Sequence, residues 1–444
     1  MHTSTAFLTD QYELTMVDAA LAAGTAHRRS VFEVFARRLP GARRYGVVAG
    51  TGRFLAALEH FRFDDAELAW LDEQNIVRRE TLDWLANYRF SGDIWGYPEG
   101  EVFFPGSPVL IVESTFAEGV LLETLALSIL NADAAVATAA SRMVNAAAGK
   151  PLAEMGSRRT GEHSAVSAAR AAYIAGFSAT SNLEAGRRYG IPTMGTAAHA
   201  FTLLHDSERD AFAAQVATLG TDTTLLVDTY DIDQGVRTAI DVAGVDLGAV
   251  RIDSGDLPTV VARVRALLDD LGATRTKITV TNDLDEYTVA ALAAAPVDSF
   301  GVGTSVVTGS GSPTMGMVYK LVAHTDADGA WVSVEKRSAD KPSIGGRKRV
   351  RRAFDDRGVA TAELVRVESS DLADVEHDET VTARSRNILV DLVHAGTVLP
   401  SHTGSEGIRA ARERHRKSLA ELPPIAMSLT RGEPALETRF IGRT

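Results

Sequence analysis

The sequence predicts an α/β fold, namely an irregular or incomplete (β/α) barrel with a smaller α+β domain built from both chain ends. Two observations carry this prediction. Short apolar runs alternate with amphipathic helical stretches from about residue 120 to about residue 310, which is the pattern of parallel βαβ units. The chain after about residue 316 is strand-rich and charged, so it needs a partner layer, which the N-terminal region can supply.

The middle region contains five apolar runs that we expect to be strands, at residues 191–195, 224–228, 249–253, 277–281 and 298–302. Two further runs, 152–156 and 175–179, bring the total to about seven strands, which favours a barrel over an open six-stranded sheet. The predicted domain boundaries are 1–118, 119–315 and 316–444.

The helix expected after residue 256 illustrates how the elements are assigned. Its apolar residues have the spacing of one buried helix face, and they are Val260, Val261, Val264, Leu267, Leu268 and Leu271. Asp256 and Pro258 suit its first turn, and Gly272 suits its end.

Composition excludes several classes of function. The 46 basic and 58 acidic residues give a net charge of −12, so we expect no nucleic-acid partner. The absence of cysteine removes disulfides, zinc–thiolate sites and cysteine nucleophiles, and no zinc is expected. We see no signal peptide at the N-terminus. The Ala-rich segment 125–148 is interrupted by polar residues and predicts a soluble helix, so we expect a cytoplasmic protein without a membrane segment.

The strongest chemical signal in the barrel region is a pair of charges within a predicted strand. Arg251 and Asp253 alternate with Val250 and Ile252, so the charged pair shares one face and should point into the barrel mouth. Catalytic groups of barrels gather at these strand ends. The pair is either a structural ion pair that closes the barrel or an anion site, with Asp253 available for a ribose hydroxyl or a metal.

Two other strand ends carry candidate residues. Asp228 alone could be a helix cap, but its strand should end near His199, and a carboxylate beside an imidazole fixes the tautomer and stabilises a phosphorylated ring. The small-residue loop at Gly301, Gly303 and Thr304 could cradle a phosphate with its backbone N–H groups. The spacing of these glycines does not match a dinucleotide fingerprint.

The basic run 346–352 is either a solvated strand face or a rim that steers an anionic substrate. Together the residues indicate a site for an anionic, phosphorylated ligand with a histidine at its edge.

Several motifs, taken in order along most of the chain, resemble those of nicotinate phosphoribosyltransferases. They are residues 9–16 (TDQYELTM), 32–40 (FEVFARRLP), 99–101, 154–159, 180–186 (TSNLEAG), 195–199, 228–231, 251–256 and 281–286 (TNDLDE). No single motif is specific, but their order is.

The resemblance implies an enzyme that joins nicotinate to 5-phosphoribosyl 1-diphosphate, giving nicotinate mononucleotide and diphosphate in NAD salvage. It implies Mg²⁺ as cofactor and coupling to ATP hydrolysis through a phosphohistidine. His199 would be that histidine, and Asp228 would orient it.

The resemblance also assigns substrate contacts. Arg158 would hold the phosphoribosyl donor, Arg251 would face the pyridine ring and its carboxylate, and Asp253 would bind the ribose hydroxyls. Gly301 and Gly303 would bind the 5′-phosphate, with Ser254 and Thr304 as further binding residues. Tyr12 would stack on the pyridine from the other subunit, which implies a homodimer. The metal ligands stay unassigned.

Alternative functions stay open. The same fold could act on nicotinamide, since a carboxylate near the amide favours nicotinamide and an unpaired arginine favours nicotinate. A quinolinate enzyme would need more basic residues, and a sugar-phosphate isomerase or aldolase would need a lysine or glutamate at a strand end. A non-catalytic phosphoribosyl-nucleotide binding module would tolerate the loss of His199.

Overall fold

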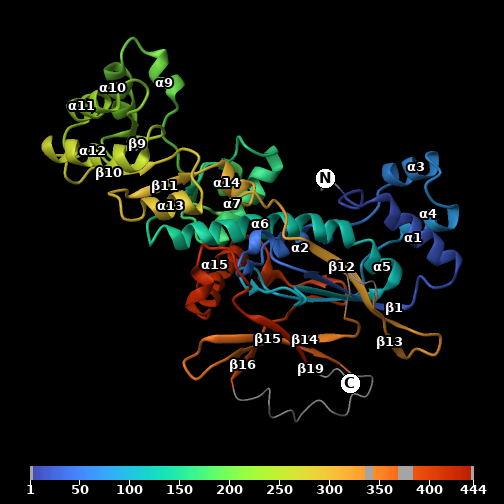
Figure 1. Cartoon of the computed structure of the whole chain (residues 1–444). Coiled ribbons are helices and arrows are strands. Elements are labelled where there is room, and N and C mark those ends of the chain that lie inside the picture. The colour runs from blue at the N-terminus through green and yellow to red at the C-terminus, as the bar shows by residue number, and fades with distance from the viewer. Residues whose placement is uncertain (1–3, 336–343, 369–383, 442–444) are drawn as a thin grey trace. The chain divides into compact units, whose positions relative to one another are not determined.

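The computed structural model describes residues 4–335, 344–368 and 384–441. The chain forms two compact units (Figure 1). The terminal unit consists of Met1–Ala135 with Thr314–Thr444, and the central unit consists of Val136–Pro313. The unit built from both chain ends is the larger of the two, not the smaller as expected, because it includes most of a long helix and three sheets.

The central unit contains one parallel sheet of six strands in the order β7-β6-β11-β10-β9-β8. The strands are β6 (Leu152–Glu154), β7 (Ala179–Thr180), β8 (Thr224–Leu226), β9 (Ala249–Ile252), β10 (Lys277–Val280) and β11 (Ser299–Val302). The last strand, β11, pairs with the first strand, β6. This is the strand order of a barrel that stays open between β7 and β8, so the incomplete barrel is confirmed.

Two predicted strands differ from the observed ones, and both lie next to the opening. Residues 191–195 form only one isolated bridge, between Thr193 and Thr180, because Pro192 has no N–H group for a ladder. The run 175–179 contributes only its last residue to β7, because Ala175 ends a helix and Gly176 has a φ of +116°.

The helices of the central unit are α7 (Glu162–Ile174), α8 (Leu183–Tyr189), α9 (His199–Leu204), α10 (Glu208–Leu219), α11 (Ile232–Ala243), α12 (Leu257–Asp270), α13 (Glu286–Leu292) and α14 (Thr304–Val307). Four of them, α8, α10, α11 and α13, begin at side-chain caps that the sequence supplies. Helix α12 confirms its prediction, since Asp256 precedes it, Pro258 lies in its first turn and Val261, Val264 and Leu268 are buried.

The terminal unit contains an antiparallel sheet of seven strands in the order β13-β12-β1-β5-β3-β17-β18. These strands are β1 (Arg29–Ala36), β3 (Asp93–Gly96), β5 (Leu110–Thr115), β12 (Met317–Thr325), β13 (Trp331–Ser333), β17 (Val390–His394) and β18 (Thr397–Val398). Strand β1 pairs with β12 over most of its length, so the N-terminal and C-terminal parts of the chain form one sheet, as predicted.

Two smaller sheets complete the strands of this unit. One has the order β16-β14-β15-β19, from β14 (Lys348–Phe354), β15 (Ala360–Val367), β16 (Ser385–Asn387) and β19 (Glu437–Ile441). The other pairs β2 (Gly46–Val47) with β4 (Val102–Phe103). The helices are α1 (Gln11–Ala22), α2 (Thr51–Leu58), α3 (Asp65–Glu73), α4 (Arg79–Ala86), α5 (Phe116–Val120), α6 (Glu123–Ala146) and the basic C-terminal α15 (Gly404–Ala420).

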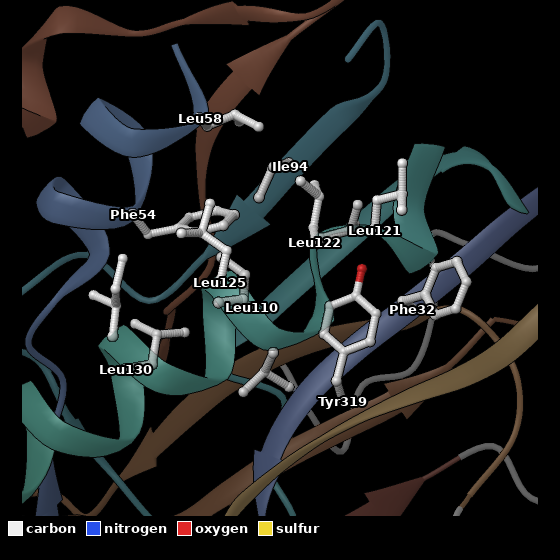
Figure 2. Packing of buried hydrophobic residues seen from close by; sticks show 14 of the residues in the cluster. Phe32, Phe54, Leu58, Ile94, Leu110, Leu121, Leu122, Leu125, Leu130 and Tyr319 are labelled. Atoms are coloured by element: carbon white, nitrogen blue, oxygen red, sulfur yellow. The ribbon is translucent and has the colours of Figure 1, made fainter. Parts of the chain in front are cut away.

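The apolar core of the terminal unit lies between its main sheet and helices α2, α5 and α6 (Figure 2). Phe32 of β1 stacks on Tyr319 of β12, with ring centroids 5.1 Å apart. The Tyr319 hydroxyl donates to the carbonyl oxygen of Gly119 at 2.7 Å, so its polar end is satisfied inside the core.

The segment 116–146 is long and apolar enough to cross a membrane by length and composition, and it is the one such segment in the described part of the chain. Two thirds (67%) of its apolar window is buried inside the structure. A buried core helix passes the same test, and α6 contributes residues such as Leu125 and Leu130 to the core.

The basic run 346–352 is a solvated strand face only in part, since Arg349 is exposed while Lys348 and Arg352 are buried. Side chains alternate along β14, and Lys348 and Arg352 point inward and are buried. Lys348 pairs with Glu33 at 2.7 Å, and Arg352 pairs with Glu363 at 2.5 Å. The solvated-face prediction therefore holds for Arg349 but not for Lys348 and Arg352, whose carboxylate partners lie on other strands. The steering rim stays a prediction for the exposed part of the run.

Replacing Arg352 by Met should destabilise the protein by about 3–5 kcal/mol, because the buried Glu363 carboxylate loses its cation. The matched control is Arg349→Met, since Arg349 pairs with Glu368 while its side chain is 74% exposed; the control should cost less than about 1 kcal/mol. Urea unfolding monitored by circular dichroism measures both values, and equal costs would contradict the buried pairing.

Candidate active site

The candidate active site lies at the carboxyl ends of the central strands. Asp228 follows β8, Asp253 follows β9 and Thr281 follows β10. His199 is the first residue of α9, which comes after the isolated bridge at Thr193. The structure therefore gathers these side chains at the edge where barrels carry their chemistry.

His199 and Asp228 are brought together as the sequence predicted. The imidazole Nε2 lies 3.1 Å from Oδ1 of Asp228. The Asp228 side chain is fully buried, whereas the His199 side chain is 42% exposed. An ionised carboxylate can only accept a hydrogen bond, so Nε2 is the donor in this pair and Nδ1 is the ring nitrogen that Asp228 does not engage.

The second oxygen of Asp228 holds the loop after β9. Its Oδ2 accepts a hydrogen bond from the Asp253 backbone N–H at 2.9 Å and another from the Ser254 hydroxyl at 2.7 Å. The helix-cap alternative for Asp228 is wrong, because Asp231 caps α11 by accepting from the Gln234 N–H. Ser254 therefore contacts Asp228 directly.

Arg251 reaches across the opening of the barrel. Its Nε donates to the Thr281 hydroxyl at 2.9 Å, and its Nη1 donates to the Thr196 hydroxyl at 3.2 Å and the Ala197 carbonyl at 3.3 Å. Its Nη2 lies 3.4 Å from Oδ1 of Asp253. The ion pair weighed in the sequence is present, and it also carries bonds to the loop before α9.

Sequence reasoning had not assigned a role to Thr196 or Thr281. The Thr281 hydroxyl donates to Asp253 and accepts from Arg251, so it joins the two charges. A signal for Thr281 was available in the sequence, because Thr281 ends the predicted strand 277–281, at the edge of the sheet where Arg251 and Asp253 were also expected.

The small-residue loop after β11 divides into a packed part and an open part. Gly301 is buried, and a Cβ there would lie 2.6 Å from both the Met155 side chain and the Thr281 methyl group. Gly303 is half-buried and Thr304 is exposed. Packing between strands therefore explains Gly301, while Gly303 and Thr304 are open to a ligand.

A buried carboxylate anchors the loop after β6. Glu154 Oε2 accepts from the Thr180 hydroxyl at 2.6 Å, and Oε1 accepts from the Gly156 N–H. Burial raises the pKa of Glu154, and these two hydrogen bonds oppose the rise. The anchored loop carries Arg158, whose side chain is exposed.

Further carboxylates lie close to Asp228. Burial and the charges of Asp228 and Asp231 raise the pKa of Glu208 to about 6, and its Oε1 is buried without a hydrogen-bond partner. Among the described residues, no group of three His, Asp or Glu side chains is arranged to hold a metal. A divalent cation here would therefore need oxygen ligands from a substrate as well.

Tyr12 lies in the other compact unit, in the first turn of α1, where its side chain is 45% exposed. Partial burial, with the charges of Glu123 and Glu13, raises the pKa of Tyr12 to about 12. Its phenol is therefore neutral, and its ring is accessible.

Comparisons with known proteins agree on one family. Residues 7–131 match the nicotinate phosphoribosyltransferase N-terminal domain, and residues 151–368 match the nicotinate phosphoribosyltransferase family. Nicotinate phosphoribosyltransferase pncB1 of Mycobacterium tuberculosis is 55% identical over 442 residues, which cover 98% of this chain and 95% of the relative. The Bacillus subtilis nicotinate phosphoribosyltransferase is 37% identical over 355 residues, which cover 78% and 72% of the two chains.

Fold similarity points the same way. The crystal structure of human nicotinic acid phosphoribosyltransferase superposes with a TM-score of 0.79 at 24% identity, covering 98% of this chain and 97% of that one. The chain belongs to the nicotinate phosphoribosyltransferase family.

Proposed function

We propose that this nicotinate phosphoribosyltransferase couples its reaction to ATP hydrolysis through a phosphohistidine at His199. The reaction joins nicotinate to 5-phosphoribosyl 1-diphosphate and releases nicotinate mononucleotide and diphosphate, an entry to NAD by salvage. The observation that carries the proposal is the hydrogen bond between the exposed His199 ring and the buried Asp228 carboxylate.

The geometry supports Nδ1 of His199 as the nucleophile. In the proposed step, Nδ1 forms a bond to the γ-phosphorus of ATP while the bond from that phosphorus to the ADP oxygen breaks. Asp228 keeps the proton on Nε2 and stabilises the positive charge that develops on the ring. Transfer of the phosphoryl group to water then completes the hydrolysis, and the added negative charge beside the donor site lasts only between these steps.

The residues around Arg251 support assignments for the other substrates. The guanidinium would face the nicotinate carboxylate, and Asp253 would bind the ribose hydroxyls beside Ser254. Gly303 and Thr304 would contact the 5′-phosphate, with Gly301 keeping the strand spacing that opens this loop. Arg158 would neutralise charge on the leaving diphosphate as the ribose develops oxocarbenium character.

Mg²⁺ fits the site as a cofactor that shares its ligands with the substrate. It would supply charge neutralisation of the departing diphosphate. Glu208 and Asp231 are the carboxylates that would hold it, because Oε1 of Glu208 is buried without a hydrogen-bond partner, and burial together with the charges of Asp228 and Asp231 raises the pKa of Glu208. Magnesium usually combines one or two carboxylates with phosphate oxygens and water.

Nicotinamide is the rival base. An amide would need a carboxylate acceptor near the ring, whereas the positive charge of Arg251 favours the acid over the amide. Arg251 already pairs with Asp253 at 3.4 Å, so the nicotinate carboxylate would join this pair rather than meet an unpaired guanidinium. The proposal also includes a homodimer and a cytoplasmic location. The location follows from the substrates, because phosphorylated substrates are retained in the cytoplasm.

Replacing His199 by Ala should abolish ATP hydrolysis and its stimulation of mononucleotide formation, while slower ATP-independent transfer to nicotinate persists. The measurement is release of ADP and of mononucleotide, with nicotinate or nicotinamide, each with and without ATP. His205→Ala is the control, because His205 ends the same helix and bonds only to a backbone carbonyl, that of Phe201. ATP hydrolysis that survives in His199→Ala would contradict the phosphohistidine.

Replacing Arg251 by Gln should raise KM for nicotinate by roughly 10–100-fold, because a charged hydrogen bond of about 1.5–3 kcal/mol is lost. KM for nicotinamide should change much less. Arg263→Gln is the control, since Arg263 forms an exposed pair with Asp233. An equal rise in KM for nicotinate and for nicotinamide would show that Arg251 does not bind the nicotinate carboxylate.

Mixing two impaired variants tests the subunit origin of Tyr12, with nicotinate far below the KM of either variant so that each alone has little activity. If Tyr12 acts across a dimer interface, equal amounts of Tyr12→Ala and Arg251→Gln subunits, unfolded and refolded together, should recover about one quarter of wild-type activity. Half of the dimers are then mixed, and each mixed dimer has one intact site. Failure to recover activity, with mixed dimers demonstrated by mass, would place Tyr12 in the site of its own subunit.

A further inference from the structure

We propose that Glu13 is a positioning residue of this enzyme, whose buried carboxylate caps α6 and thereby fixes the turn of α1 that presents Tyr12. The inference rests on the substrate role proposed for Tyr12, and it adds a residue in direct chain connection with it. Both helices belong to the terminal unit and are labelled in Figure 1.

The Glu13 carboxylate joins three segments, namely α1, the start of α6 and the residues before α1. Its Oε1 accepts the Thr124 N–H at 2.9 Å and the Thr124 hydroxyl at 2.5 Å. Its Oε2 accepts the Thr9 hydroxyl from the segment before α1. The residue is fully buried, so these three donors replace the water that an exposed carboxylate would bind.

The partner of Glu13 is the first turn of a long helix. Thr124 is the second residue of the 24-residue α6, and the first N–H groups of a helix have no intrahelical acceptor. The residue before α6 is Leu122, which has no side-chain oxygen to cap it. Glu13 supplies the missing acceptor from another helix, and its negative charge is favourable at this end of the helix dipole.

This cap also determines where Tyr12 points. Consecutive residues of a helix are rotated by about 100°, so a buried Glu13 leaves Tyr12 at the surface, where its side chain is 45% exposed. Fixing the Glu13 side chain to α6 therefore fixes the direction of the aromatic ring. Loss of the cap would leave Tyr12 on a first turn that is free to fray.

The titration of Glu13 makes this arrangement testable. Burial raises the pKa of Glu13 to about 7, against the hydrogen bonds from Thr124 and Thr9. The charged and titratable groups that face this cluster are Asp10 before α1, Tyr12 on α1, Glu123 on α6 and Lys320 on β12. Above about pH 7 the ionised carboxylate accepts all three donors; below it, one oxygen carries a proton and the cap weakens.

Stability and positioning should respond to pH with opposite signs. The folded-state pKa lies above the ordinary value of 4.5, so the folded protein binds this proton more tightly than the unfolded chain. The stabilisation from the protonated group is complete below about pH 4.5 and is lost as the pH rises through about 7. Tyr12, in contrast, is held best above pH 7.

The first test is KM for nicotinate between about pH 6 and about pH 8.5. In the wild-type enzyme KM should rise roughly 3–10-fold as the pH falls through about 7. Glu13→Gln keeps the acceptor oxygen but cannot ionise, so this pH dependence should disappear. Glu13→Ala should raise KM at every pH, with kcat changed less. Glu13→Gln resembles the protonated carboxyl group, so it should give a smaller rise that is the same at every pH and close to that of the wild-type enzyme on the acid side.

Glu67→Gln is the matched control, because Glu67 is the half-buried glutamate of the capping box that begins α3. It should leave the pH profile of KM unchanged. A merely structural Glu13 would lower the melting temperature of Glu13→Ala without altering the pH dependence of KM, and that result would overturn the proposal.

A second readout does not depend on activity. With 3-fluorotyrosine placed at position 12, the ¹⁹F resonance of the free protein should titrate near pH 7, and the titration should be absent in Glu13→Gln. No titration, or the same titration in Glu13→Gln, overturns the positioning role and leaves the proposed function untouched. A third outcome is a titration that depends on Glu13 together with a KM for nicotinate that Tyr12→Ala leaves unchanged. That outcome supports the positioning role of Glu13 and contradicts the substrate role of Tyr12.

Discussion

The buried carboxylate of Asp228 is the constraint on which the rest of the site depends. One of its oxygens faces Nε2 of His199, and the other accepts from the Asp253 N–H and the Ser254 hydroxyl. A carboxylate with a fully buried side chain needs several donors to stay ionised. Satisfying Asp228 therefore fixes the loops after β8 and β9 and the start of α9 relative to one another, and it sets the tautomer of the histidine.

The open edge of the barrel explains why these loops meet where they do. The sheet closes between β6 and β11 and stays open between β7 and β8. No strand ladder continues past the single bridge at Thr193, so the chain between that bridge and His199 is free to run as a loop. Arg251 donates hydrogen bonds to Thr196 and Ala197 of this loop. These side-chain bonds hold the loop where strand-to-strand backbone hydrogen bonds do not.

The terminal unit is held together by contacts between residues that are hundreds of positions apart. Strand β1 pairs with β12, and the ion pairs of Glu33 with Lys348 and of Arg352 with Glu101 join the two ends of the chain. Buried ion pairs add little net stability, but breaking one is costly. They therefore favour one pairing of the chain ends over alternatives, and the same unit positions α1 and α6, where Glu13 and Tyr12 lie.

The sequence by itself determined the elements and the faces of their side chains. Hydrophobic periodicity identified five of the six strands of the barrel and the limits of α12, and strand alternation placed Arg251 and Asp253 together, because both are set by local geometry. Apart from the pairs His199–Asp228 and Arg251–Asp253, only the tertiary structure decided the partners. The tertiary structure buried Lys348 and Arg352. It gave Asp228 three hydrogen-bond partners instead of a helix to cap. It also brought Thr281, Glu154 and Glu13 into contact with their hydrogen-bond partners. Those contacts join residues up to 315 positions apart, and local spacing carries no information about which distant segment the fold will place beside them.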